Sequence, residues 1–427
     1  MAHPLQAIST ADADPRSTAG PPRFTPETHA RALYLHLPFC FHKCHYCDFY
    51  SVVERGDTDR QDAFTDALIA ELTDWSRRIT LRPTTVFAGG GTPTYLRPEL
   101  WDRLLTALHG LNLLDHAAEF TVEANPETVT PALMKQLADG GVNRVSIGAQ
   151  SFQRESLKAL ERWHDPDNVG RAVDACRAAG LHNLSLDLIF AVPGQTLAML
   201  EDDLARLAEL RPTHLSTYGL TYEPNTALSA RLRLGQVTPL DEDTQRAMYQ
   251  CVLDRLQAHG FEHYEISNWA RQPPPGPTRT ASDPADLPRP HAAPPLPADL
   301  RCRHNLAYWR NQNWLGVGPA AASHLGGHRW RNAPNLNTYL KTSPTPTAED
   351  YEHLPPDQRV GEQLMLGLRL AEGVALDWLR RHLPADDRRH DAIDEMIDLN
   401  LLERTPARLR LTRAGLFVAD SVIAKLL

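Results

Sequence analysis

Cysteine is scarce in this sequence, which has only six in 427 residues. So few cysteines exclude a fold that depends on a dense disulfide framework, and they are typical of a reducing compartment. Long apolar stretches are missing as well, so the sequence offers no candidate transmembrane segment. Its first residues lack the basic and apolar regions of a secretory signal. We therefore expect a cytoplasmic protein.

An excess of positive charge is also missing. The 53 acidic residues outnumber the 44 basic ones and give a formal net charge of −9. This balance argues against a general nucleic-acid-binding surface. The sequence shows no internal repeat of the solenoid type. A chain of this length buries large cores and is expected to form two or three domains.

Composition divides the chain into four stretches. Residues 1–26 are rich in Ala, Pro, Ser and Thr and predict a disordered leader. Residues 27–265 alternate short apolar runs with helical patterns, and residues 355–427 predict a separate C-terminal domain. Between them, the region 266–354 carries a Pro-, Ala- and Asp-rich insertion at 271–300 that cannot pack a core. This insertion is interpreted either as neutral or as a flexible gate.

Three of the six cysteines, Cys40, Cys44 and Cys47, lie within eight residues and follow an apolar run. Thiolates packed this closely on a loop favour an iron–sulfur cluster or zinc. A four-iron cluster held by only three cysteines keeps one iron open to a small ligand. Two alternatives remain on spacing alone. His42 or His45 completes a zinc site, or three unrelated thiols are buried.

Strand and helix patterns alternate through the second stretch. The predicted strands are 33–39, 85–88, 119–124, 144–148, 184–190 and 214–220, and the predicted helices include 61–78, 98–109, 131–138 and 197–210. Repeated strand–helix units imply parallel strands with helical crossovers. About six such units predict an α/β fold with a partial TIM-like (β/α)6 barrel, in which the chemistry gathers at the C-terminal ends of the strands.

Chemically informative residues stand at these predicted strand ends. The glycine run 89–91 follows a strand, and glycine lets a backbone approach a ligand closely, although a simple tight turn explains it equally well. Glu123 and Gln150 end two further strands, where ordinary loop-side polar residues also occur. Asp187 lies inside an apolar strand, and burial of a carboxylate without a partner costs several kcal/mol. Asp187 therefore indicates a functional contact.

The cysteine spacing resembles that of the radical SAM superfamily, in which the open iron of a [4Fe-4S] cluster binds S-adenosylmethionine (SAM). Tyr46 matches an aromatic residue that often lies between the last two cysteines. Further segments resemble one branch of that superfamily, the oxygen-independent coproporphyrinogen III oxidase family. They are 34–40, 87–94, 123–126, 146–152 and 187–196.

This resemblance implies which residues hold each cofactor. Cys40, Cys44 and Cys47 are expected to bind the cluster. The residues expected to contact SAM are Tyr34, Tyr46, Gly90, Gly91, Thr92, Glu123, Gln150, Arg162 and Asp187. Arg162 matches by position alone, and a solvated cation at a helix end is its alternative interpretation.

The family contains oxidases and heme chaperones, and two positions favour the chaperones. The oxidases carry a fourth cysteine two residues after the third, where this sequence has Phe49. Residues 304–309, His-Asn-Leu-Ala-Tyr-Trp, resemble a motif of the chaperones whose histidine is a proposed heme contact. Imidazole is a good axial ligand for heme iron, and Arg301 and Arg303 are suited to pair with propionates. From residue types alone, His304 is more often part of a structural hydrogen-bond network.

One stretch departs from the family's pattern. The family's G-x-G-P-S-A-H-S stretch corresponds to residues 316–323, where Ala320 and Ala322 replace the serine and the histidine. Any role of that histidine is lost or passes to His324.

Helical patterns followed by a short β-ribbon predict a winged-helix-like C-terminal domain. Because this domain has no concentrated basic helix, we expect a lid or a partner surface rather than a DNA reader.

We therefore expect a heme chaperone that binds heme, a [4Fe-4S] cluster and SAM. It would transfer heme to an acceptor protein, with membrane-associated acceptors among the candidates. A coproporphyrinogen III oxidase is the alternative within the family. A zinc-dependent nucleic-acid-binding regulator is the alternative from another class, and the acidic balance argues against it.

Overall fold

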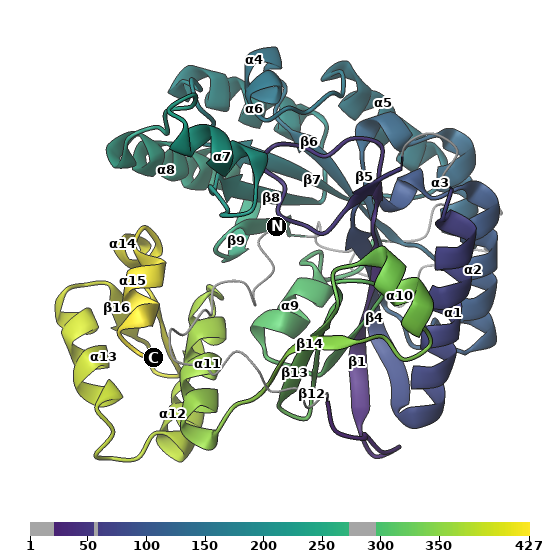
Figure 1. The fold of residues 1–427 in the computed structure, drawn as a ribbon. Coiled ribbons are helices and arrows are strands. Elements are labelled where there is room, and N and C mark those ends of the chain that lie inside the picture. The colour runs from purple at the N-terminus through teal and green to yellow at the C-terminus, as the bar shows by residue number, and fades with distance from the viewer. Residues whose placement is uncertain (1–20, 55–58, 273–295) are drawn as a thin grey trace, which may run out of the picture.

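The computed structural model describes residues 21–54, 59–272 and 296–427. Within these ranges, twelve strands form one curved, open sheet in the order β14-β13-β12-β11-β1-β4-β5-β6-β7-β8-β10-β9 (Figure 1). The strands at its centre run parallel. They are β11 (Trp314–Val317), β1 (His29–Leu37), β4 (Thr80–Gly90), β5 (Glu119–Ala124), β6 (Arg144–Gln150), β7 (Asn183–Phe190) and β8 (His214–Gly219).

Antiparallel strands extend the sheet at both edges. One edge consists of β12 (Ala322–Leu325), β13 (His328–Asn332) and β14 (Ala348–His353), and the other of β10 (Asn268–Arg271) and β9 (Phe261–Glu265). Two short strands, β2 (Phe39–Cys40) and β3 (Val52–Val53), pair separately. They hold together the two ends of the cysteine loop (residues 40–51), which begins at Cys40 in β2 and carries Cys44 and Cys47.

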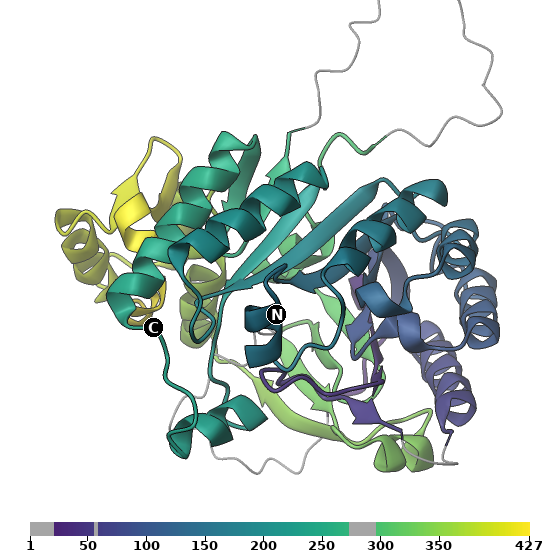
Figure 2. The same ribbon diagram turned by 90° about the horizontal axis from the view of Figure 1, so that it is seen from above.

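Helices cover the outer face of the sheet (Figure 2). Strands β5 and β7 are buried along almost their whole length, as expected for parallel strands covered on both faces. The helices that follow the parallel strands are α1 (Gln61–Arg78), α2 (Pro98–Gly110), α3 (Pro131–Asp139), α4 (Arg154–Ala159), α5 (Asp167–Ala178), α6 (Leu197–Glu209), α7 (Ala227–Arg233) and α8 (Glu242–Ala258). Thr130 and Thr196 cap α3 and α6 through their side chains. The main core lies between these helices and the sheet.

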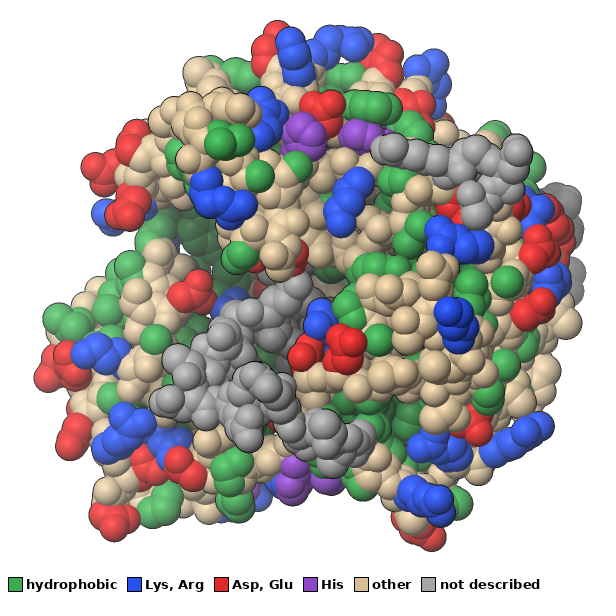
Figure 3. Space-filling view, in the orientation of Figure 1, with side chains coloured by type: hydrophobic (Ala, Val, Ile, Leu, Met, Phe, Trp, Pro, Cys, Tyr) green, Lys and Arg blue, Asp and Glu red, His purple; other side chains and the backbone are tan. Residues whose placement is uncertain are grey.

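The region after β10 contributes α9 (Arg303–Trp309) and α10 (Leu336–Thr342) besides its strands. The C-terminal domain has its own core and consists of α11 (Pro356–Leu368), β15 (Val374–Ala375), α12 (Leu376–His382), α13 (Arg389–Asp398), β16 (Leu402–Arg404), β17 (Arg408–Leu411), α14 (Arg413–Leu416) and α15 (Ala419–Ala424). It packs beside the open side of the barrel (Figure 1). The surface is hollowed where this domain meets the part of the barrel with α7 and α8 (Figure 3).

The alternation of strands and helices agrees with the sequence patterns, and the strand 119–124 and the helix 61–78 have their predicted bounds. Residues 21–26 of the predicted leader are described, and Phe24 there stacks on Trp330 with 5.5 Å between ring centres. Residues 1–20 of that leader and 273–295 of the insertion lie outside the described residues. In the part of the chain that the structure covers, no helix has the length and apolar character needed to cross a bilayer.

Candidate functional site

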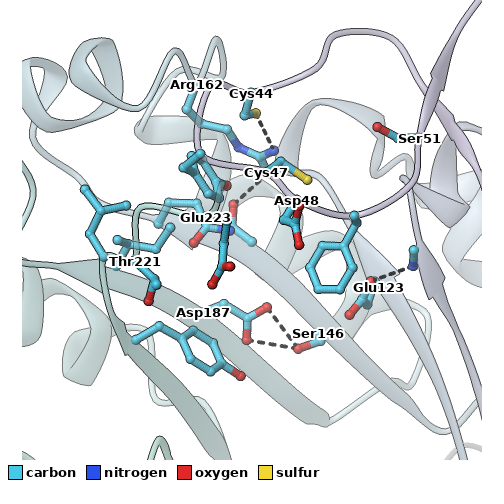
Figure 4. Close-up of a pocket in the computed structure, with 18 of the residues that line it drawn as sticks. Cys44, Cys47, Asp48, Ser51, Glu123, Ser146, Arg162, Asp187, Thr221 and Glu223 are labelled. Carbon is cyan, nitrogen blue, oxygen red and sulfur yellow. Dashed lines mark hydrogen bonds between the residues drawn. The ribbon is translucent and has the colours of Figure 1, made fainter. Parts of the chain in front are cut away.

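A cavity of about 600 Å³ opens at the C-terminal ends of the parallel strands. The cysteine loop forms one wall, the ends of β4 to β8 form the floor, and residues of the C-terminal domain form part of the opposite wall. Figure 4 shows Cys44, Cys47 and Arg162 above Asp187, Ser146 and Glu123. The predicted cluster ligands and most of the predicted SAM residues therefore meet in one place.

The three thiols of the loop are all directed into this cavity region. Cys40 Sγ lies 3.4 Å from Thr92 Oγ1, and Arg162 Nη1 donates to Cys44 Sγ at 3.7 Å. Burial, together with the neighbouring Cys44 and Cys40, raises the pKa of Cys47 to about 11, so without a bound positive group this residue is a thiol. Three thiolates are stable together here only beside a positive group, so this donor set fits an iron–sulfur cluster.

The geometry gives less support to the zinc alternative. Among the described residues, no three His, Cys, Asp or Glu side chains converge on one point in the way a single metal ion requires. His42 Nε2 donates to Glu161 O at 3.2 Å, and its ring stacks on Trp163. Arg231 Nη1 donates to His45 Nδ1 at 3.3 Å. A cubane cluster needs no such convergence, because each cysteine binds a different iron.

Strand ends supply the polar floor of the cavity. Gly90 N donates to Glu123 Oε2 at 3.3 Å, and Ser146 Oγ donates to Asp187 Oδ1 at 3.1 Å. Gln150 lines the same cavity with φ of 62°, in the left-handed region that few non-glycine residues adopt. Arg162 Nη2 donates to Gly148 O at 3.0 Å, so Arg162 ties the cysteine loop to β6 and is not a solvated cation.

The glycines at the end of β4 are required by close packing. Gly90 has φ of 102°, and a Cβ on it would lie 2.5 Å from the His36 ring. A Cβ on Gly91 would lie 2.6 Å from the Pro38 backbone. Both glycines therefore let β4 pass the end of β1 while their backbones line the cavity.

Two buried carboxyl groups share this floor. Burial raises the pKa of Glu123 to about 7, and the nearby Asp187 raises it in the same direction. Burial also raises the pKa of Asp187, although hydrogen bonds from Ser216 and Ser146 oppose the shift. A cationic or amine-bearing ligand would favour the charged forms of both groups.

The turn that presents Gln150 is held from behind by α6. Asp203 is fully buried and accepts hydrogen bonds from Ser151 Oγ and Phe152 N, both at 2.7 Å. Gln153 Nε2 donates to the same carboxylate at 3.3 Å. These bonds fix the backbone directly after Gln150 and so explain how its left-handed conformation is kept.

Comparison with known proteins agrees with this geometry. Residues 34–207 match the radical SAM superfamily, and residues 354–418 match the HemN C-terminal domain. The heme chaperone HemW of Lactococcus lactis is 33% identical over 396 residues, which cover 92% of this chain and 96% of that protein. The chain belongs to the HemW family. The HemW protein of Mycobacterium tuberculosis is 35% identical over 92% of this chain and 94% of its own length. That of Bacillus subtilis is 30% identical over 93% of this chain and 99% of its own length.

The fold of this HemW family member is also found in a solved structure. Coproporphyrinogen III oxidase (HemN) from Escherichia coli superimposes with a TM-score of 0.74 at 20% identity, over 95% of this chain and 91% of that one. The predicted fold class, a radical SAM barrel with a further C-terminal domain, is confirmed by this likeness and by the family matches.

Two tyrosines predicted to contact SAM differ in position. Tyr46 lines the cavity of this HemW family member. Tyr34 is not among the described residues that line it, because it lies three residues before the end of β1 and points into the barrel below. There the hydroxyl oxygen of Tyr34 lies 3.1 Å from His36 Nδ1, and its side chain packs with Phe87 and Cys302. A direct contact from Tyr34 to SAM thus remains a sequence-based prediction.

His304 also lies inside the barrel rather than in the cavity. It is 1% exposed, with Nδ1 3.0 Å from Thr85 Oγ1 and Nε2 2.9 Å from Tyr308 OH. Its ring stacks on Phe87. Both ring nitrogens are engaged, so heme iron would reach His304 only after α9 rearranged. The heme contact remains a prediction that this geometry does not support.

The arginines beside this motif are placed differently from one another. Arg301 forms an ion pair with Asp299 at 2.7 Å, and the side chain of Arg303 is exposed. Neither lines the cavity among the residues that the structure describes. Trp309, the last residue of the motif, does line it.

Sequence reasoning missed several residues of the cavity. They are Asp48, Ser146, Tyr218, Thr221, Glu223, Ser267, Arg369 and Asp420. Ser146 was detectable, because it shares one strand face with Gly148 and Gln150 by the two-residue period. Arg369 and Asp420 had no local signal, since only the packing of the C-terminal domain brings them to the cavity.

Proposed function

We propose that this HemW family member binds a [4Fe-4S] cluster, SAM and heme, and transfers heme to an acceptor protein. One observation carries the proposal. The cavity places the three thiols of Cys40, Cys44 and Cys47 above a floor that contains Glu123, Gln150 and Asp187. The names of its relatives, heme chaperones, supply the role of heme.

Different residues of the cavity would bind the cluster and SAM. The thiols hold the cluster, which when bound supplies an open iron for SAM. Arg162 braces the thiol loop through Cys44 and Gly148. Glu123 and Asp187 offer buried carboxylates to the positive groups of SAM, and hydrogen bonds to charged groups are worth about 1.5–3 kcal/mol. Phe49 lines the cavity where the oxidases of the family have a fourth cysteine, and this position favours a carrier over an oxidase.

The cluster is tested by replacing Cys40, Cys44 and Cys47 together with alanine. After anaerobic reconstitution we expect loss of the iron–sulfur absorbance and of bound iron and sulfide. Cys176→Ala is the matched control and should keep the cluster, because Cys176 is fully buried on α5 and contacts Met134, away from the cavity. Retention of the full cluster by the triple variant would contradict the ligand assignment.

Heme is tested on the same reconstituted protein. Titration with heme should give a saturable change in absorbance, and apo-acceptor added afterwards should reverse it. With cluster, SAM and a reductant present, we expect no conversion of coproporphyrinogen III. Robust conversion would move the protein to the oxidase class, and absence of saturable heme binding would overturn the chaperone proposal.

A further inference from the structure

The charges around the cavity are unequally distributed. Among the described residues that line it, the acidic ones are Asp48, Glu123, Asp187, Glu223 and Asp420, and the basic ones are Lys43, Arg162 and Arg369. The acidic floor suits the positive groups of SAM. An iron porphyrin instead carries two propionate groups, which need cations. Few residues of this cavity are able to provide them.

Two of the three cations already have partners in or beside the cysteine loop. Arg162 donates to Cys44, Gly148 and His164, so all its nitrogens have partners on that side. Lys43 is exposed and donates to Phe49 O at 3.4 Å. Arg369 stands apart, because it comes from the C-terminal domain on the opposite wall.

Arg369 is held in place but keeps an exchangeable partner. It follows the last residue of α11, and its carbonyl accepts a hydrogen bond from Ile266 N at 3.2 Å, which fixes its backbone to the barrel. The guanidinium lies over the Trp309 ring at 5.6 Å. Its Nη2 donates to Asp420 Oδ1 at 2.8 Å.

Asp420, the ion-pair partner of Arg369, is highly exposed to solvent. The Arg369 side chain is 20% exposed, whereas that of Asp420 is 87% exposed. An ion pair with so exposed a member contributes little, typically about 0–1 kcal/mol. A ligand carboxylate that enters the cavity is able to form a bidentate pair with Arg369 from a drier position, where such a pair is stronger.

We propose that Arg369 is the carboxylate-binding residue of this cavity, and that it exchanges Asp420 for a propionate of the bound porphyrin. Trp309 supports the flat guanidinium from below and offers an apolar face to the macrocycle. This inference rests on the proposed function, since it requires heme to occupy this cavity. It assigns the propionate edge of heme to the wall formed by the C-terminal domain.

The test compares heme with heme dimethyl ester, which has no free carboxylates, in one detergent-containing buffer. Arg369→Gln should weaken heme binding about tenfold or more, because a charged hydrogen bond is lost. Asp420→Ala should tighten heme binding up to about fivefold, because a competing carboxylate is removed. Neither change should alter binding of the ester by more than about twofold. Binding is measured by absorbance titration of the full chain.

Arg413→Gln is the matched control. Arg413 pairs with Asp254 and also joins the C-terminal domain to the barrel, but it does not line the cavity in the described structure. Its heme and ester affinities should equal those of the unmodified protein. Asp420→Ala and Arg369→Lys carry the test if Arg369→Gln does not fold.

The outcomes separate this inference from the proposed function. If the unmodified protein binds neither ligand, the proposed function itself fails. If it binds heme and ester equally and both substitutions are silent, heme binding stands and the role of Arg369 is wrong. An equal loss for heme and ester in Arg369→Gln would also overturn the carboxylate assignment.

Discussion

Glu123 is a cavity residue whose carboxyl group changes charge near neutral pH. Its carboxyl group is buried at the end of β5, and burial together with Asp187 raises its pKa from 4.5 to about 7. The group is therefore mostly neutral at pH 6 and mostly charged at pH 8 before a ligand binds. Only the charged form accepts hydrogen bonds from positive ligand groups at full strength.

We expect SAM to bind more weakly at pH 6 than at pH 8, by about tenfold, because the charged fraction of Glu123 falls by that factor. Equilibrium dialysis of cluster-loaded protein at the two pH values measures this. Glu123→Gln cannot ionise and should bind SAM weakly but almost independently of pH. An unchanged pH slope in that variant would assign the dependence to another group.

Residue-level prediction from sequence worked where a local rule fixed the position. Parallel strands bring their C-terminal ends to one edge, so Glu123, Gln150 and Asp187 were expected together and do line one cavity. Tyr34 shows the limit of this rule, because its depth along β1 decides whether it faces the cavity or the barrel interior. The brace from Asp203 depends on packing of α6 against the turn after β6, which no local pattern encodes.

At the scale of elements, α9 is fixed to the barrel by its first two residues. Glu119 accepts hydrogen bonds from the backbone N–H of Arg303 at 2.9 Å and of His304 at 3.1 Å, so a carboxylate of β5 caps the helix. The His304 ring then links Thr85 of β4 to Tyr308. The sequence motif is thus built into the barrel interior.

We expect His304→Ala to lower the free energy of unfolding by about 2–4 kcal/mol, because Thr85 and Tyr308 lose a buried partner and a cavity remains. The heme absorbance spectrum should not shift. Chemical denaturation and heme titration of the same sample measure the two effects. A shifted heme spectrum with unchanged stability would instead support His304 as a heme ligand.

The sequence analysis predicted no strands in the region directly after α9, where β11 to β14 lie. Strands β12 to β14 are short, and they carry polar residues such as His324 and Arg331 that hide the two-residue apolar period. Their place in the sheet depends on β11 pairing with β1, which lies far away in the sequence. The C-terminal helices and ribbon were easier to predict from sequence, because their periodicity is local.

At the scale of the whole molecule, a buried ion pair joins the barrel to the C-terminal domain. Arg329 of β13 contacts Glu362 of α11, and their side chains are only 4% and 5% exposed. Asn311 Nδ2 also donates to Glu362 Oε2 at 2.7 Å. This contact holds the wall that carries Arg369 against the barrel.

Removing Glu362 leaves the buried Arg329 with only Glu352, whose side chain is 42% exposed, as its counter-charge, and takes the acceptor from Asn311. Because hydrogen bonds to a charged group are lost, we expect Glu362→Ala to cost about 1.5–3 kcal/mol and to raise hydrogen exchange in α11 before the barrel opens. Glu372→Ala is the control, because Glu372 pairs with Arg310 across the same boundary in a half-exposed position. It should cost less than about 1 kcal/mol. Equal effects of both substitutions would show that burial of the pair has no special role.

The central position of β1 has a consequence for how the chain is made. Its edges pair with β4 on one side and with β11 on the other, and β11 begins only at Trp314. At synthesis rates of about 5–20 residues per second, the nascent chain presents one unpaired edge of this leucine-rich strand for roughly 15–60 s. A chain truncated before β11 therefore ends its sheet at β1, and this exposed edge is able to pair with another truncated copy.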